Sequence, residues 1–85
     1  MREKQQRFLR LYEPVQPTLP RYLRYKIADP QNGEDVLQEV LAAAYASLDS
    51  LTDEARFRPW LLSIASHKCM DYYRRTGERL GLPLE

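Results

Sequence analysis

The stretch from Phe57 to Arg75, FRPWLLSIASHKCMDYYRR, decides the fold expected for this chain. Four apolar residues of its first half are spaced like one face of a helix: Phe57, Trp60, Leu61 and Ile64. That spacing is typical of a helix that packs against a core. Proline fits only where its missing N–H needs no partner, so the helix should begin within about three residues of Pro59. After Ala65 the residues become basic and aromatic, which predicts one helix with a buried half and an exposed half.

A second amphipathic helix precedes this stretch and is expected to begin at Asp29-Pro30 and to end near Leu48. Aspartate is a favourable N-cap, and proline suits the first helical position. Apolar residues then recur at three- and four-residue steps, which places Leu37 and Leu41 among the expected core residues. The remaining surface of this helix is acidic.

The residues before position 29 are expected to form two shorter helices. Residues 2–13 favour a helix, and three prolines between positions 14 and 20 then interrupt it. A second helix should run from about Thr18 to Ala28. Its core side would carry three apolar residues: Leu19, Leu23 and Ile27. These segments together predict an all-α fold, a compact bundle of three to four helices.

The length of 85 residues leaves room for one domain, so we expect a single unit over residues 1–85. Its core should span about residues 5–76, and residues 77–85 would be a linker or tail. One cysteine excludes an intrachain disulfide, and with one histidine it leaves no plausible zinc site. We expect no cofactor. The charged amino terminus lacks the apolar run of a signal peptide, which favours a cytoplasmic protein without a membrane partner.

Charge is strongly segregated along the chain. Residues 1–28 carry a net charge of +5, residues 29–54 a net charge of −7, and residues 55–85 a net charge of +3. Such segregation favours separate binding faces, one for a polyanion and one for a basic partner. The alternative is that the blocks neutralise one another in the folded domain. The sequence does not decide between these interpretations.

The chemistry of the sequence indicates binding rather than catalysis. His67 has no obvious nucleophile partner, because Cys69, two positions away, lies on a different side of the helix, and no glycine-rich phosphate loop is present. An enzyme is therefore not expected. The last helix combines Lys68, Arg74 and Arg75 with Tyr72 and Tyr73, and the first segment adds Arg21, Arg24 and Tyr25. Basic groups neutralise phosphates and tyrosine rings stack on unpaired bases, so this mixture suits single-stranded or melted nucleic acid.

The order of these motifs resembles the second conserved region of bacterial RNA polymerase sigma factors, in particular the extracytoplasmic-function (ECF) subfamily. That region typically has an acidic helix with D-x-x-Q-E, a loop, F-x-x-W-L-x-x-I-A and a D-x-x-R-R ending. The matching segments are Asp35-Val-Leu-Gln38-Glu39, Phe57-Arg-Pro-Trp60-Leu61, Ile64-Ala65 and Asp71-Tyr-Tyr-Arg74-Arg75. The resemblance covers roughly Phe8 to Arg75.

This resemblance implies a transcription initiation factor domain that binds core RNA polymerase. In the family, the D-x-x-Q-E helix docks on the clamp coiled coil of the largest polymerase subunit, so Asp35, Gln38 and Glu39 would make that contact. An anti-sigma factor is a further possible partner. The acidic middle block of the chain would then have a binding role.

The resemblance also implies recognition and melting of the minus-ten promoter element as single-stranded non-template DNA. A loop before the last helix would hold a base flipped from that strand, and its residues are Asp49, Ser50, Leu51, Thr52, Asp53 and Glu54. A loop suits this task because it varies while the helix beneath it stays fixed. The expected DNA-binding residues are Arg56, His67, Lys68, Asp71, Arg74 and Arg75. His67 stands where asparagine is common in the family.

Two alternatives remain open from the sequence. The first is a sigma-like interaction module that binds polymerase or an anti-sigma factor without reading DNA. The second is a generic helical bundle, in which neither the acidic nor the basic set matters for binding. The fourth conserved region of the family, a helix-turn-helix domain, is absent from these 85 residues. A lone second region should therefore bind promoters weakly.

Overall fold

The stretch that begins at Phe57 forms the longest helix of the protein. The computed structural model describes residues 2–77. Its elements are α1 (Arg2–Tyr12), η1 (Glu13–Val15), α2 (Thr18–Lys26), α3 (Pro30–Ala46), η2 (Leu48–Ser50), η3 (Glu54–Arg56) and α4 (Phe57–Thr76), where η denotes a short 3-10 helix. The predicted all-α bundle is confirmed, and the described residues contain no strand.

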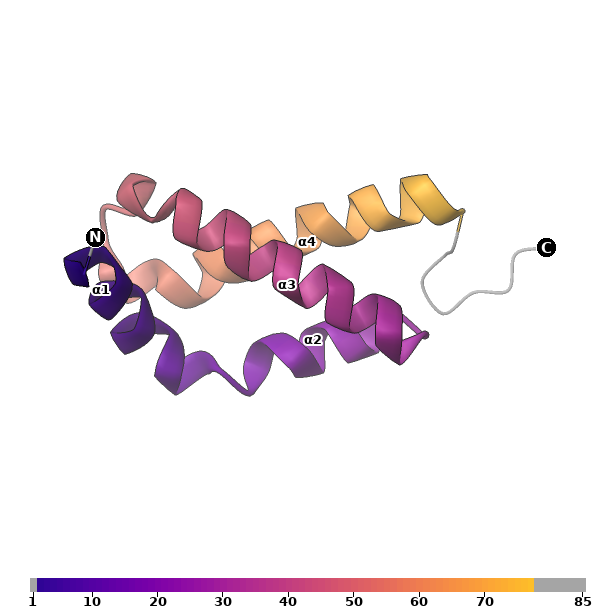
Figure 1. The fold of residues 1–85 in the computed structure, drawn as a ribbon, viewed down its shortest axis with the longest axis horizontal. Helices are drawn as coiled ribbons and strands as arrows, with labels where there is room; N and C mark the ends of the chain where they lie inside the picture. The colour runs from indigo at the N-terminus through magenta and orange to yellow at the C-terminus, as the bar shows by residue number, and fades with distance from the viewer. Residues whose placement is uncertain (1, 78–85) are drawn as a thin grey trace.

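The helices form an elongated bundle around α3 and α4 (Figure 1). α3 packs along α4, and α2 contacts both of them. α1 and α2 follow one another with a bend at η1, which lies among the prolines of the N-terminal segment. The loop of η2 and η3 lies at the end of the bundle beside α1, and the turn from α2 into α3 lies at the opposite end.

Local sequence signals account for the ends of α3 and α4. The Asp29 side chain accepts hydrogen bonds from the backbone N–H groups of Gln31 (2.8 Å) and Asn32 (3.4 Å), and Pro30 is the first helical residue. α3 therefore begins where the sequence predicts. α4 ends at Gly77, which has φ of 76° and donates its N–H to the Tyr73 carbonyl at 2.8 Å. Glycine adopts this left-handed conformation without steric cost.

The buried face of α4 extends farther than the sequence analysis expected. Its buried residues are Phe57, Leu61, Ala65, Cys69 and Tyr72. They recur every three or four residues, so a single stripe faces the core along almost the whole helix. The expected division of α4 into a buried half and an exposed half is wrong in this respect. Cysteine behaves as a small apolar residue, and a tyrosine ring can be buried when its hydroxyl is hydrogen-bonded.

The rest of the core comes from α1, α2, α3, η2 and the segments between helices. Phe8 of α1, Leu19 and Leu23 of α2, Val40 of α3 and the loop residue Leu51 are among its buried members. Of the six residues expected in the core, Phe57 and Leu61 are buried. The other four are half-buried and pack against the core: Leu37, Leu41, Trp60 and Ile64. They lie at its edge because each stands between one buried and one exposed helix position.

Aromatic packing attaches α1 to the bundle. The Phe8 ring lies 5.7 Å from the ring of Tyr45 on α3 and 6.0 Å from the ring of Phe57 on α4, measured between ring centroids. Both contacts are edge-to-face, an arrangement that aromatic pairs prefer. Phe57, the first residue of α4, therefore also helps to hold α1 in position.

The single domain over residues 1–85 stays a prediction, with its core at about residues 5–76. The expected linker or tail over residues 77–85 lies outside the described residues, except for Gly77. Within residues 2–77 no helix has both the length and the apolar character needed to cross a membrane.

Candidate functional site

The outer face of α3 displays the acidic and amide residues that the sequence analysis selected. Val36 and Val40 point into the core, so Asp35, Gln38 and Glu39 lie on the other side of the helix. Asp35 and Gln38 are exposed, and the Glu39 side chain is 41% exposed. These three side chains are accessible to a macromolecular partner.

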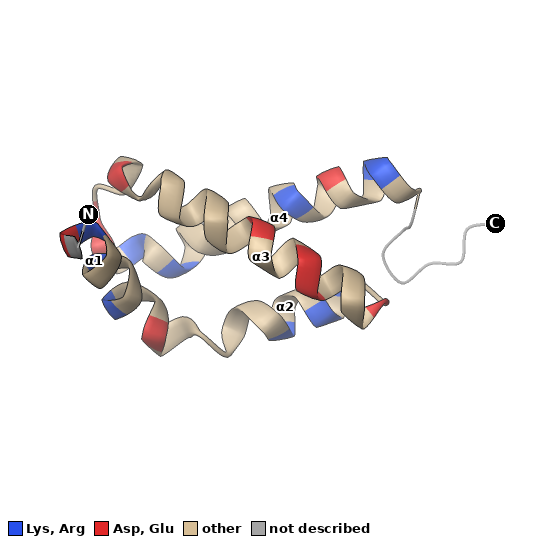
Figure 2. Ribbon diagram, in the orientation of Figure 1, with Lys and Arg blue, Asp and Glu red and all other residues tan. Residues whose placement is uncertain are grey.

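The second half of α4 displays most of the charged residues expected to bind DNA. Figure 2 shows these charges on α4 and the acidic positions on the first half of α3. His67, Asp71, Arg74 and Arg75 are exposed, and Lys68 is half-buried. The guanidinium of Arg74 lies 3.1 Å from the Asp71 carboxylate one turn away.

One ion pair joins these two surfaces. Nη2 of Arg75 lies 3.8 Å from Oε2 of Glu39, across the α3–α4 interface. The expected polymerase-binding and DNA-binding residues therefore meet on neighbouring helices. This pair also shows that the charged blocks of the chain partly neutralise one another in the folded domain.

Tyr72 and Tyr73 do not form the stacking surface that the sequence analysis expected. Tyr72 is 3% exposed, and its hydroxyl accepts a hydrogen bond from the Asn32 side-chain amide at 3.0 Å. The half-buried Tyr73 donates its hydroxyl to the Lys26 carbonyl at 2.7 Å. Both rings pack between α4 and the turn from α2 to α3, because their spacing continues the buried stripe. Tyr72 therefore has a structural role and is not available to stack on a base.

The loop expected to capture a base encloses a hollow of about 340 Å³. The lining residues are Ser50, Leu51, Thr52, Asp53, Arg56, Pro59 and Trp60. Asp53 shapes this loop: its carboxylate accepts the Ala55 N–H at 3.0 Å and lies 3.7 Å from the Arg56 guanidinium. The hollow falls within the size range of small-molecule sites.

Individual loop residues differ in their exposure. Asp49, Ser50, Thr52 and Asp53 are exposed, Glu54 is half-buried, and Leu51 is 6% exposed. Leu51 belongs to the core and lines the hollow at its base. Asp53 is the N-cap residue of η3.

Two arginines of α1 hold this loop, and no sequence pattern indicates their role. Nε of Arg7 donates to Oε2 of Glu54 at 2.8 Å, and Nη2 of Arg7 donates to the Leu51 carbonyl at 3.2 Å. Arg10 donates to both carboxylate oxygens of Glu54, at 3.1 and 3.2 Å. We call Arg7, Arg10 and Glu54 the α1–loop clamp. No local pattern indicates it, because its partners are 44 and 47 residues apart.

The clamp changes the acidity of Glu54. Hydrogen bonds from Arg10 and Arg7 lower the pKa of this carboxyl from 4.5 to about 2. Both guanidinium groups stabilise the ionised form, and this effect outweighs the partial desolvation of the carboxylate. Glu54 is therefore fully ionised at neutral pH.

This pKa shift predicts a defined response to acid. A carboxyl with a lowered folded-state pKa contributes stability that is fully present above its unfolded value, near 4.5, and is lost as pH falls through about 2. An NMR titration of the Glu54 carboxyl carbon should therefore have its midpoint near the lower value. Substituting glutamine for Arg10 should move that midpoint upward. A midpoint at the ordinary value in the unmodified protein would contradict the clamp.

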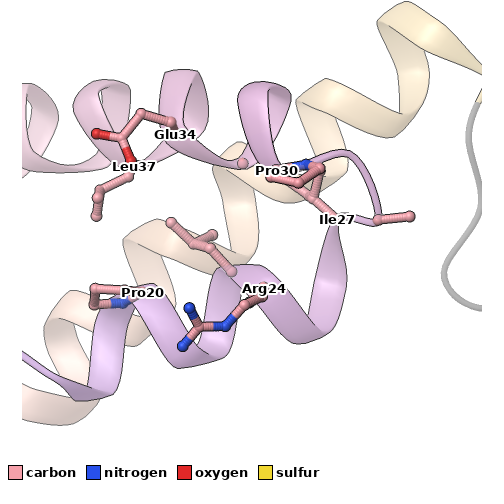
Figure 3. A pocket seen from close by; sticks show the side chains of 9 residues that line it. Pro20, Arg24, Ile27, Pro30, Glu34 and Leu37 are labelled. Atoms are coloured by element: carbon pink, nitrogen blue, oxygen red, sulfur yellow. The ribbon is translucent and has the colours of Figure 1, made fainter.

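A second hollow, of about 220 Å³, lies between α2 and α3 at the opposite end of the bundle. Figure 3 shows it between Pro20 and Arg24 of α2 and Glu34 and Leu37 of α3. Its lining is largely apolar, and it is separate from the loop hollow. Of the expected site residues, only the core residue Leu37 lines it.

The residues that the structure describes indicate neither a metal site nor a reactive thiol. Residues 2–77 contain no cluster of three histidine, cysteine or acidic side chains that is arranged to hold a metal ion. Burial raises the pKa of the Cys69 thiol, which disfavours the reactive thiolate.

The sequence of this chain is similar to those of known proteins. The family model for sigma-70 region 2 matches residues 11–79. The ECF RNA polymerase sigma factor SigX of Bacillus subtilis (strain 168) is 34% identical over 68 residues, which are 80% of this chain and 35% of SigX. The ECF RNA polymerase sigma factor BldN of Streptomyces coelicolor is 30% identical over 74 residues, which are 86% of this chain and 28% of BldN.

A third relative, the ECF RNA polymerase sigma factor SigM of Bacillus subtilis (strain 168), is 31% identical over 65 residues, which are 76% of this chain and 39% of SigM. The chain thus spans roughly a third of the length of these curated relatives. No solved structure matches the chain.

Proposed function

This chain belongs to the sigma-70 region 2 family, and we propose that it is a transcription initiation factor domain that binds core RNA polymerase and recognises the minus-ten promoter element as melted, single-stranded non-template DNA. The proposed role is binding, with no catalytic step. It extends to this chain the activity named for its ECF sigma factor relatives, of which the chain covers only a part.

The observation that carries this proposal is the relation between α3 and α4. These helices pack through their buried faces, which leaves the D-x-x-Q-E residues of α3 and the D-x-x-R-R residues of α4 on the surface. The Glu39–Arg75 pair links the two sets. A partner with a basic surface and a polyanion can therefore bind next to one another on one small domain.

We propose that polymerase binds the outer face of α3 through Asp35, Gln38 and Glu39. Asp35 and Gln38 are both exposed, and the Gln38 side-chain amide donates a 3.4 Å hydrogen bond to the Glu34 carboxylate. An acidic, accessible helix face is suited to a basic protein surface. The largest polymerase subunit is the proposed partner.

We propose that DNA crosses the outer side of α4 and ends in the loop hollow. Lys68, Arg74 and Arg75 would neutralise phosphates, with His67 beside them, and Asp71 would orient Arg74 through their 3.1 Å contact. The hollow between η2, η3 and the start of α4 would receive an extruded base. Because Tyr72 is buried, the aromatic wall available to that base is Trp60.

Replacing Arg74 and Arg75 together with glutamine tests the DNA surface. Each lost phosphate contact on a single strand lowers the slope of log affinity against log salt by about 0.7, so the pair should lower it by about 1.4. The measurement is fluorescence anisotropy of a labelled single-stranded DNA oligonucleotide across a salt series. Circular dichroism should show an unchanged helix content, because both side chains are exposed.

A matched variant separates this surface from general charge loss. Replacing Arg21 and Arg24 with glutamine also removes two exposed positive charges that the sequence offered for nucleic-acid binding, but on α2 and not on the α4 surface proposed for DNA. This control should leave the salt slope close to that of the unmodified protein. An equal decrease in both variants would contradict the placement of DNA on α4.

A further inference from the structure

Arg7 bridges the two ends of the segment that forms one wall of the loop hollow. A guanidinium presents five donors in a rigid, planar fork. Here that fork donates to the backbone carbonyl of Leu51 at 3.2 Å and to the side chain of Glu54 at 2.8 Å. The positions of Thr52 and Asp53, which lie between these two anchors and line the hollow, are thereby restricted.

Arg10 completes the attachment. It binds both oxygens of the Glu54 carboxylate, so this one side chain accepts three hydrogen bonds from two arginines. Bidentate, charge-assisted hydrogen bonds are stronger and more directional than neutral ones. Lys4 adds a longer contact of 3.9 Å to Asp49 at the other end of the loop. One face of α1 therefore holds the loop at several points.

α1 is itself a fixed support for this contact. Phe8, next to Arg7, is 8% exposed and packs edge-to-face on Phe57 at the start of α4. Pro59 and Trp60, two and three residues after Phe57 on α4, also line the hollow. The loop is therefore attached to α1 through Arg7, and the start of α4 is attached to α1 through the adjacent residue Phe8.

We propose that Arg7 and Arg10 are positioning residues for base capture, which act through Glu54 to hold the loop hollow in one shape and so sharpen its choice of base. This inference rests on the proposed function, because it assumes that the hollow receives a base. The arginines touch the loop rather than DNA. Their role is to reduce the number of loop conformations that a bound base can select.

The central test is Glu54→Gln, with Glu13→Gln as its matched control. Both substitutions remove one negative charge and preserve side-chain shape, but the exposed Glu13 lies outside the clamp. Amide hydrogen exchange of residues 51–56 should become about two- to fivefold faster in Glu54→Gln, the range expected for partly exposed ion pairs. Exchange in α4 should not change, and Glu13→Gln should match the unmodified protein in both segments.

Base choice is measured separately by selection from a single-stranded DNA pool with a short randomised tract. In Glu54→Gln, the preference at the captured position should fall by about two- to fivefold. Affinity for a scrambled oligonucleotide should equal that of Glu13→Gln, because the two variants have the same net charge. A role confined to stability would leave this preference unchanged at temperatures where the variant is folded.

A second variant alters the α1 side of the clamp, at Arg10. Arg10→Gln should produce a smaller increase in exchange of residues 51–56 than Glu54→Gln, because Arg7 still binds Glu54. Combining the two should add little to Glu54→Gln alone, because that substitution already removes the Arg10 contact. Additive effects of the two substitutions would overturn the clamp as the cause. Comparing the two single variants with the double variant also shows whether a local folding defect in one of them causes the effect.

The outcomes distinguish this inference from the proposed function. Unchanged exchange of residues 51–56 in Glu54→Gln would overturn the clamp, whatever the result with DNA. Faster exchange with an unaltered base preference would overturn its role in base choice. Absence of any base preference in the unmodified protein would instead contradict base capture itself, and the exchange measurement would still decide whether Arg7 and Arg10 hold the loop.

Discussion

Alanine at both Gln38 and Glu39 is expected to weaken the binding of core RNA polymerase by about 30-fold or more. We expect this pair to include a hot spot of the interface, and hot-spot residues contribute at least about 2 kcal/mol, which corresponds to this change in affinity. Both side chains lie on the outer face of α3, and Glu39 remains 41% exposed despite its pair with Arg75. Capture of purified core polymerase on immobilised domain, followed by dissociation-constant measurement, gives the result directly.

The control for this prediction is a Gln/Glu pair elsewhere on the surface. Alanine at Gln6 and Glu13 removes the same functional groups from exposed positions in the α1–η1 segment. Polymerase binding should be unchanged in that variant, and both proteins should have the circular dichroism spectrum of the unmodified domain. Equal polymerase binding by the Gln38/Glu39 variant and the unmodified protein would exclude this face as the contact.

The same variants separate the proposed function from a polymerase-binding module that does not read DNA. Both ideas predict weaker polymerase binding when Gln38 and Glu39 are removed. Only the proposed function predicts a base preference for single-stranded DNA and a smaller salt slope after substitution of Arg74 and Arg75. A full salt slope in the latter variant, with no base preference in the unmodified protein, would favour the interaction module.

The parts of the fold that could be predicted from sequence depend on local signals. Asp29-Pro30 specifies a helix start through one side chain and one missing N–H, and Gly77 specifies a helix end through its left-handed backbone. The core positions of the second predicted helix followed from spacing alone and are confirmed: Leu19 and Leu23 of α2 and its C-cap residue Ile27 are buried. Such signals act within one or two turns of the chain.

The features that escaped prediction depend on contacts between distant segments. Tyr72 continues the buried spacing of α4, but the partner of its hydroxyl could not be predicted from neighbouring residues, because Asn32 is 40 residues away. The α1–loop clamp joins residues 44 and 47 positions apart. An arginine on an exposed helix position has the same sequence pattern whether it contacts solvent, DNA or another segment. Of the expected site, the exposed surfaces were therefore predictable, and the support of the loop was not.

Alanine at Leu61 is expected to destabilise the domain far more than any substitution on its surface. Leu61 is 1% exposed and belongs to the buried stripe of α4 where that helix meets the core. Removing a buried leucine side chain to Cβ typically costs about 2–5 kcal/mol through lost burial and the remaining cavity. Native domains are stable by only about 5–15 kcal/mol, and small ones lie toward the lower limit.

Urea denaturation followed by far-UV circular dichroism and by the fluorescence of the single tryptophan, Trp60, measures this effect. Leu9→Ala is the control, because Leu9 is 57% exposed and its truncation should change the free energy of unfolding by no more than about 0.5 kcal/mol. Leu61 contacts neither proposed partner, so polymerase and DNA binding should decrease together, in proportion to the unfolded fraction. If the folded Leu61→Ala protein lost binding to polymerase or to DNA but not to both, α4 would not be the common support of both surfaces.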